Sequence, residues 1–169
     1  MEGEQRLTGE GDAAKAVGPR DLREWLALIE ADGGLRRITA EVDADEELAA
    51  ITYMVARDED APALMFENIR GNESGVRVLS NMLGASRRRF ALAVGLDPDL
   101  STRDLIAAMR ERGREHISPI EVAADTAPVN ARVLRGDDID LTRLPAPKFW
   151  PHDGGAYIGT GDITLTRDP

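Results

Sequence analysis

The residues best suited to chemistry lie in one stretch near the C-terminal end, LPAPKFWPHDGGAYIGTGD at residues 144–162. Its prolines stiffen the approach, because each fixes a backbone φ angle and removes an amide donor. Gly154 and Gly155 would then allow a backbone path that most residues cannot take. Gly159, Thr160 and Gly161 follow in a strand-like run with almost no side-chain bulk. Glycine within a strand marks a place where a ligand or another backbone approaches closely.

Thr160 is the one hydroxyl that this glycine-rich run would present, and it could both donate and accept a hydrogen bond. Two interpretations stay open for the run. It is either a ligand-binding strand or a strand that glycines bend to close a β-barrel.

The two histidines give no metal motif. His152, between Pro151 and Asp153, could serve as an acid, a base or a ligand. A metal site needs several ligands, so a lone histidine favours a structural role. His116 follows the expected helix end at Gly113 and is interpreted as a loop residue. The chain has no HExxH, no Walker loop, no GxSxG and no GxGxxG opening a helix.

A basic cluster, Arg87 to Arg89, opens a predicted helix, where three cations oppose the helix dipole. Arginines that lie in solvent or at an interface are the favoured interpretation, and an anion site is the minor one. The preceding segment 81–84 fits an ordinary strand-to-helix turn better than a ligand loop.

Helices and strands alternate in the part of the chain that precedes these motifs. Apolar residues at helical spacing predict helices that begin at Asp21, at about Asp45, at Ser86 and at Ser101. Short apolar runs predict strands over 35–42, 63–66 and 76–79, with a turn at 72–75 between the last two. This mixture predicts an α/β (α+β) domain.

The expected organisation has three parts. Residues 1–20 have almost no apolar periodicity and read as a disordered leader. Residues 21–120 form the α/β domain. Residues 121–169 are rich in proline, carry strand candidates at 129–134 and 157–166, and are interpreted as the opening strands of an incomplete β-rich domain.

Composition narrows the class of protein. The 169 residues include 31 acidic and 21 basic side chains, for a formal charge of −10, which argues against nucleic-acid binding. No apolar run is long enough for a membrane helix, and no signal segment opens the chain. The absence of cysteine excludes disulfides and thiolate chemistry in this sequence. A cytoplasmic location is therefore expected.

Three stretches together resemble the UbiD family of reversible decarboxylases, in the family's order. They are segments 21–25 with 38–42, segment 77–95, and segments 144–147 with 150–169, of which the last is the most specific. The resemblance covers roughly residues 20–169.

The resemblance implies a small N-terminal α/β domain that leads into a split β-barrel holding prenylated FMN. The family acts on aromatic and α,β-unsaturated carboxylic acids, with a divalent metal, usually Mn²⁺, and K⁺ beside the flavin phosphate. A separate flavin prenyltransferase supplies the cofactor, and members commonly assemble as homo-oligomers. The cofactor is the electron sink, while the protein orients the substrate and handles protons.

Two residues carry over as cofactor-binding candidates. Thr160 matches the family's flavin-pocket threonine, and Gly161 lies beside it. The family's metal ligands and its Glu-Arg-Glu network belong to segments later than Pro169, so no catalytic or metal-binding residue is assigned in this chain. His152 does not match the metal histidine.

The leading hypothesis is therefore the N-terminal part of a carboxy-lyase, inactive as this fragment alone. The alternative is a stand-alone, non-catalytic module for assembly or partner binding. A simple FMN-binding split barrel with reductase-like chemistry is disfavoured, because the chain supplies too few strands to close a barrel.

Overall fold

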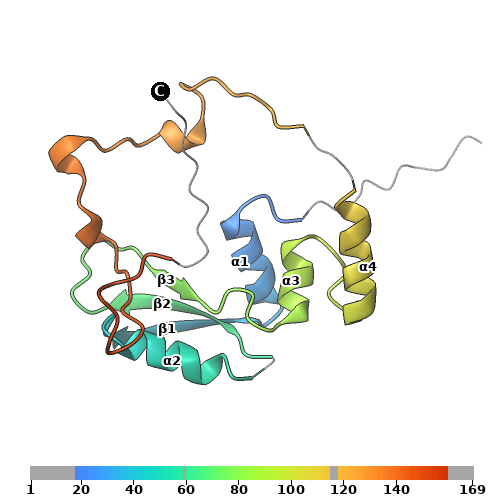
Figure 1. The fold of residues 1–169 in the computed structure, drawn as a ribbon, viewed down its shortest axis with the longest axis horizontal. Coiled ribbons are helices and arrows are strands. Elements are labelled where there is room, and N and C mark those ends of the chain that lie inside the picture. Colours follow the sequence, from blue (N-terminus) through green and yellow to red (C-terminus); the bar gives the residue numbers. More distant parts are fainter. Residues whose placement is uncertain (1–17, 59, 115–117, 160–169) are drawn as a thin grey trace, which may run out of the picture.

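The computed structural model describes residues 18–58, 60–114 and 118–159, and its centre is a three-stranded sheet in the order β1-β2-β3 (Figure 1). The strands are β1 (Leu35–Val42), β2 (Ala63–Ile69) and β3 (Val78–Ser80). β2 pairs with β1 in parallel and with β3 antiparallel. Helix α2 (Glu47–Val55) provides the crossover that two parallel neighbours require. The predicted α/β (α+β) class is confirmed.

The core lies on both faces of the sheet, because β2 is central and its side chains alternate between the faces. On one face, Ala63 and Met65 pack with helices α1 (Leu22–Ala31) and α3 (Arg87–Ala93). On the other, Leu64 and Phe66 pack with α2. The layers are therefore α1 and α3, then the sheet, then α2.

Helix starts follow local hydrogen bonding closely. The Asp21 carboxylate accepts from the amides of Arg23 and Glu24, which caps α1 as predicted. Ser86 caps α3, and Ser101 caps α4 (Thr102–Arg112). Helix α2 begins at Glu47 rather than at about Asp45, because Glu46 has a φ of 66° and cannot be part of the helix.

The segment after residue 118 differs from the prediction. The predicted strand at 129–134 is wrong: Pro128–Asn130 form a 3-10 helix, and two more follow at Gly136–Asp138 and Leu141–Arg143. No strand of the described chain pairs with this region, and Val129 is 84 % exposed. Residues 157–159 of the second candidate are not a strand either.

Two parts of the prediction fall on residues that the structure does not describe. The rest of the strand candidate at 157–166 and residues 1–17 of the expected leader lie outside the described residues. Within the described residues, no helix is long and apolar enough to cross a membrane.

Candidate functional site

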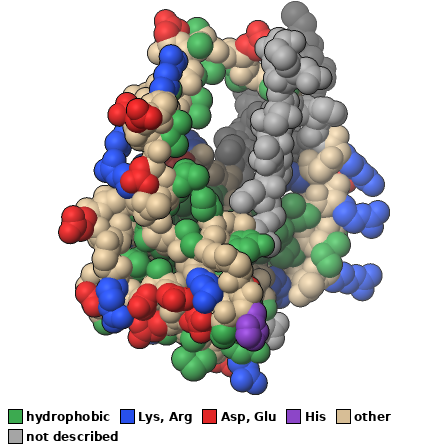
Figure 2. Space-filling model, turned by 60° about the vertical axis from the view of Figure 1, so that its left-hand side comes forward, with side chains coloured by type: hydrophobic (Ala, Val, Ile, Leu, Met, Phe, Trp, Pro, Cys, Tyr) green, Lys and Arg blue, Asp and Glu red, His purple; other side chains and the backbone are tan. Residues whose placement is uncertain are grey.

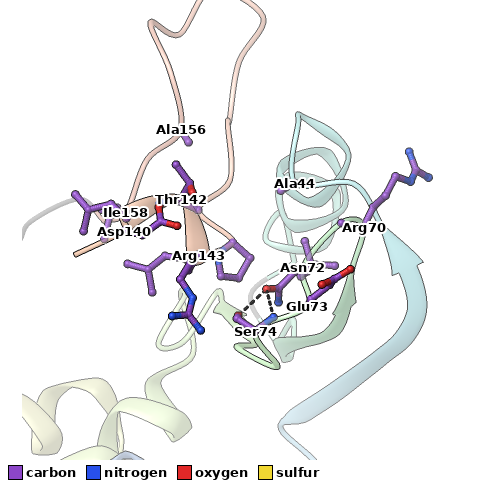
Figure 3. Close-up of a pocket in the computed structure, with 16 residues that line it drawn as sticks. Ala44, Arg70, Asn72, Glu73, Ser74, Asp140, Thr142, Arg143, Ala156 and Ile158 are labelled. Carbon is purple, nitrogen blue, oxygen red and sulfur yellow. Dashed lines mark hydrogen bonds between the residues drawn. The ribbon is translucent and has the colours of Figure 1, made fainter. Parts of the chain in front are cut away.

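A cleft of about 910 Å³ separates the connection between β2 and β3 from the C-terminal segment, and Figure 3 shows the side chains that line it. One wall consists of residues 69–74 together with Ala44. The other wall consists of residues 140–146, Ala156 and Ile158. Figure 2 shows hydrophobic side chains gathered in the middle of one face, with acidic and basic side chains along the edge below them.

The wall from the β2–β3 connection is shaped by its own polar residues. Gly71 has a φ of 73°, a conformation that glycine adopts without strain. The side-chain oxygen of Asn72 accepts from the Ser74 amide at 3.1 Å and from the Ser74 hydroxyl at 2.6 Å. The Asn72 amide donates to the Val76 carbonyl at 2.7 Å. The predicted turn at 72–75 is thus a loop closed by a single asparagine.

The opposite wall is shaped in a similar way. The Asp140 carboxylate accepts from the Thr142 amide at 2.9 Å and from its hydroxyl at 2.6 Å, which caps the 3-10 helix Leu141–Arg143. These hydrogen bonds hold the pKa of Asp140 below its ordinary value. On the other wall, the Arg70 side chain points away from the cleft (Figure 3) and pairs with Glu41 at 3.0 Å and with Asp43 at 2.9 Å. The lining includes Glu73, Asp140 and Arg143, so the cleft offers charged groups of both signs.

Lys148 anchors the C-terminal segment to the beginning of α2. Its amide donates to the Ala44 carbonyl, and its carbonyl accepts from the Glu46 amide, both at 3.0 Å. Its ammonium lies 3.2 Å from a Glu46 carboxylate oxygen and 3.5 Å from one of Asp45. The hydrogen bond to Glu46 raises the pKa of Lys148. These contacts fix Glu46 in its unusual backbone conformation.

Two further contacts extend this anchor. The rings of Tyr53 and Trp150 meet edge to face, with centroids 5.6 Å apart and planes at 75°. The Tyr157 amide donates to the carbonyl of the buried Pro147 at 2.7 Å, which folds the glycine-rich stretch back on itself. The segment that leads toward residue 160 is therefore attached to the sheet domain through α2.

The structure bears differently on each site residue predicted from the sequence. Thr160 and Gly161 lie outside the described residues. His152 is exposed in a turn that Asp153 closes by accepting from the Trp150 amide. Gly154 and Gly155 do not have a positive φ, and a Cβ on either would meet nothing within 4 Å, so the predicted need for glycine is wrong there. The described part of the chain contains no group of three or more possible metal ligands among His, Cys, Asp and Glu.

Two arginines of the basic cluster make structural contacts, and the burial of Arg89 corrects the interpretation that it lies in solvent or at an interface. Arg89 is only 3 % exposed and donates to the backbone carbonyls of residues 61, 81, 82 and 83. Arg88 bridges Asp32 and Asp99, while Arg87 is exposed. Helical spacing gave a usable signal, because Arg89 precedes Leu92 and Ala93 by one turn, and both pack against the core.

Comparison with protein-family models identifies both parts of the chain. Residues 26–109 match the N-terminal domain of 3-octaprenyl-4-hydroxybenzoate carboxy-lyase, and residues 120–169 match its Rift-related domain. The chain belongs to the UbiD family. The matches cover the sheet domain, the Lys148 anchor and the glycine-rich stretch.

Individual UbiD relatives are considerably longer than this chain. A pyrrole-2-carboxylic acid decarboxylase from Pseudomonas aeruginosa is 35 % identical over 102 residues, which are 56 % of this chain and 20 % of that relative. The vanillic acid decarboxylase of Sedimentibacter hydroxybenzoicus in its open form matches with a TM-score of 0.74 and 32 % identity, over 83 % of this chain and 30 % of that one.

A third relative was solved with a flavin. An evolved dimeric form of the UbiD-class enzyme HmfF from Pelotomaculum thermopropionicum, in complex with prFMN, matches with a TM-score of 0.64 and 30 % identity. The match covers 79 % of this chain and 29 % of that one. The chain thus spans between a fifth and a third of the length of these relatives.

Proposed function

We propose that this chain is the N-terminal part of a non-oxidative decarboxylase that uses prenylated FMN to remove CO₂ from aromatic or α,β-unsaturated carboxylic acids. The observation that supports this best is the double family match, in which the N-terminal domain and the Rift-related domain of the carboxy-lyase occur in order. Related decarboxylases act on pyrrole-2-carboxylic and vanillic acids, and one UbiD-class relative was solved with prFMN.

Thr160 and Gly161 are the proposed contacts to the flavin in this chain. The rest of the pocket would come from further polypeptide. The described residues contain no group of three or more possible metal ligands among His, Cys, Asp and Glu, so no metal is assigned to them. Mn²⁺, K⁺ and a flavin prenyltransferase as cofactor supplier are proposed for the complete enzyme, as are a homo-oligomeric state and a cytoplasmic location.

The proposed division into a leader (1–20), an α/β domain (21–120) and the start of a split β-barrel (121–169) fits the pattern of exposure. Apolar side chains in the third part remain open to solvent in the described structure, among them Val122 at 63 %, Val129 at 84 % and Ile158 at 66 %. Such exposure is costly unless other polypeptide covers it. The same exposure favours the alternative function, a non-catalytic module that binds a partner, if no downstream segment exists.

The deciding experiment begins with the intact mass of the native protein that carries this sequence, purified from its source. A mass far above 18.4 kDa leads to CO₂-release assays on hydroxybenzoate, pyrrole carboxylate and cinnamate, after co-production with a flavin prenyltransferase. Release from at least one acid is expected. A complete protein that binds prenylated FMN yet releases no CO₂ from any of these acids contradicts the proposal, and a native mass of 18.4 kDa favours the module.

The isolated 169-residue chain provides a second test. We expect it to bind FMN weakly or not at all, because most of the proposed pocket is missing. Titration of FMN fluorescence measures this directly. Micromolar binding by the isolated chain would show that the pocket is already complete, against this expectation.

A further inference from the structure

Helices α3 and α4 form an apolar groove outside both core clusters. The groove encloses about 620 Å³, and its floor includes Phe90, Leu105 and Met109. Leu105 is buried, but it belongs to neither cluster on the sheet. Ile106, also in the lining, is 56 % exposed, so the groove opens to solvent along one side of α4.

The rim of this groove carries a charge opposite to that of the chain. Its lining includes two arginines, Arg87 from α3 and Arg110 from α4, and no acidic residue. The chain as a whole has a formal charge of −10. An apolar floor between cations suits an amphipathic helix with acidic flanks, because such a helix satisfies both the apolar surface and the charges.

The same chain presents a helix face of that kind on α2. Tyr53 is 57 % and Met54 is 64 % exposed, and Trp150 packs against Tyr53 to widen the apolar surface. Residues 45–58 contain four carboxylates, at positions 45, 46, 47 and 58, and one basic residue, Arg57. Lys148 pairs with the carboxylates of Asp45 and Glu46, so the α2 face keeps an acidic excess of two charges. This α2 face lies on the opposite layer of the sheet from α3, so a chain cannot insert it into its own groove (Figure 1).

We propose that the α3–α4 groove binds the exposed face of α2 from a second copy of the chain. Charge complementarity favours this occupant, since two arginines border the groove and the α2 face keeps an acidic excess after Lys148 has paired with Asp45 and Glu46. Residues 1–17 of the same chain are a poor occupant, because their sequence offers few large apolar side chains. The contact is head-to-tail, so each copy retains one free groove and one free α2 face unless a ring closes. The proposal does not depend on the decarboxylase function.

Sedimentation velocity over a concentration series tests the proposal on the 169-residue chain. We expect reversible association that weakens as salt is raised, because the flanking charges are screened. Ile106→Asp places a carboxylate in the groove, where Arg110 one turn away tolerates it. Met54→Lys places a cation on the α2 face, in the last turn of the helix, which favours cations. Each variant alone should associate at least about tenfold more weakly than the wild type.

An equimolar mixture of the two variants gives the decisive result. Ile106→Asp retains an intact α2 face and Met54→Lys retains an intact groove, so the mixture should form a one-to-one dimer that neither variant forms alone. An exposed Asp–Lys pair between the two altered surfaces is too weak to hold two chains together. Ile120→Asp is the matched control, because Ile120 is more exposed than either residue and belongs to neither surface.

The proposal is overturned if the wild type stays monomeric throughout the series, if either variant associates as the wild type does, or if the mixture stays monomeric. A designed acidic amphipathic helical peptide provides a further check. If the wild type is monomeric and the peptide changes the chemical shifts of Ile106 and Met109, the groove binds another protein, and the proposal is equally overturned. Circular dichroism of each variant confirms that a loss of association does not reflect unfolding.

Discussion

Replacing Arg89 with methionine should destabilise the sheet domain by about 2–4 kcal/mol. The guanidinium is 3 % exposed, and its two shortest hydrogen bonds reach the carbonyls of Ala61 at 2.5 Å and Met82 at 2.9 Å. A hydrogen bond to a charged group contributes about 1.5–3 kcal/mol, so losing both removes about 3–6 kcal/mol. Burial disfavours the cation and lowers the pKa of Arg89, and relief of that cost returns part of the loss.

Urea denaturation measures this loss. Trp25 is buried in the core cluster beside α3, so its fluorescence reports on the domain, and far-ultraviolet circular dichroism provides a second probe. With a slope of about 1–3 kcal/mol per M urea, a loss of about 2–4 kcal/mol should lower the midpoint by roughly 0.7–4 M. Arg89→Lys should recover little, because a single ammonium cannot reach carbonyls that the planar guanidinium bridges.

Arg87→Met is the matched control, since Arg87 is exposed and should change the free energy of unfolding by no more than about 0.5 kcal/mol. Equal midpoints for the Arg87 and Arg89 variants would refute the reasoning. In that case the 81–84 loop would keep its shape without Arg89, and the carbonyls would find water instead.

Two further predictions concern ion pairs. Hydrogen bonds from Arg88 lower the pKa of Asp32, so this pair stabilises the fold above the ordinary carboxyl pKa of about 3.8 and the stabilisation is lost as pH falls through the lower folded value. Arg88→Gln should therefore make urea midpoints less dependent on pH between neutral pH and about pH 3, and an unchanged dependence would disprove the linkage. Lys148→Ala should speed hydrogen exchange at the Glu46 amide more than Arg143→Ala does, because only Lys148 braces the segment that accepts from that amide. Equal exchange in both variants would mean that the backbone pairing holds without the ammonium.

The sequence alone was sufficient to predict the helices and strands that depend on interactions between residues close in the chain. Asp21, Ser86 and Ser101 start helices because a side-chain oxygen accepts from an amide two or three residues later, which is visible in the sequence. The apolar run of β2 likewise predicts a strand that is buried on both faces. The parallel register of Leu35 with Ala63 could not be predicted, since it depends on how α2 packs.

The parts that escaped prediction depend on distant residues. Nothing near Glu46 in the sequence explains its positive φ, which is supported by hydrogen bonds to Lys148. The interpretation that Arg89 lies in solvent or at an interface is wrong, because its partners are backbone carbonyls of loops, one of them 28 positions away at Ala61. In segment 118–159, strand-like composition did not produce strands, and its backbone pairing with the rest of the described chain is a single β-bridge between Lys148 and Asp45. Thr160 and Gly161 rest on the family resemblance alone.

The contact between Glu46 and Lys148 joins residues 102 positions apart, and this separation has a consequence for synthesis. A ribosome adds about 5–20 residues per second, so Lys148 emerges on the order of 5–20 seconds after Glu46. Until then the positive φ of Glu46 has no support, and such a conformation costs on the order of 1–3 kcal/mol. The N-terminal end of α2 should therefore be frayed on the nascent chain while α1 and the strands form. It should become ordered only when the glycine-rich stretch is being synthesised.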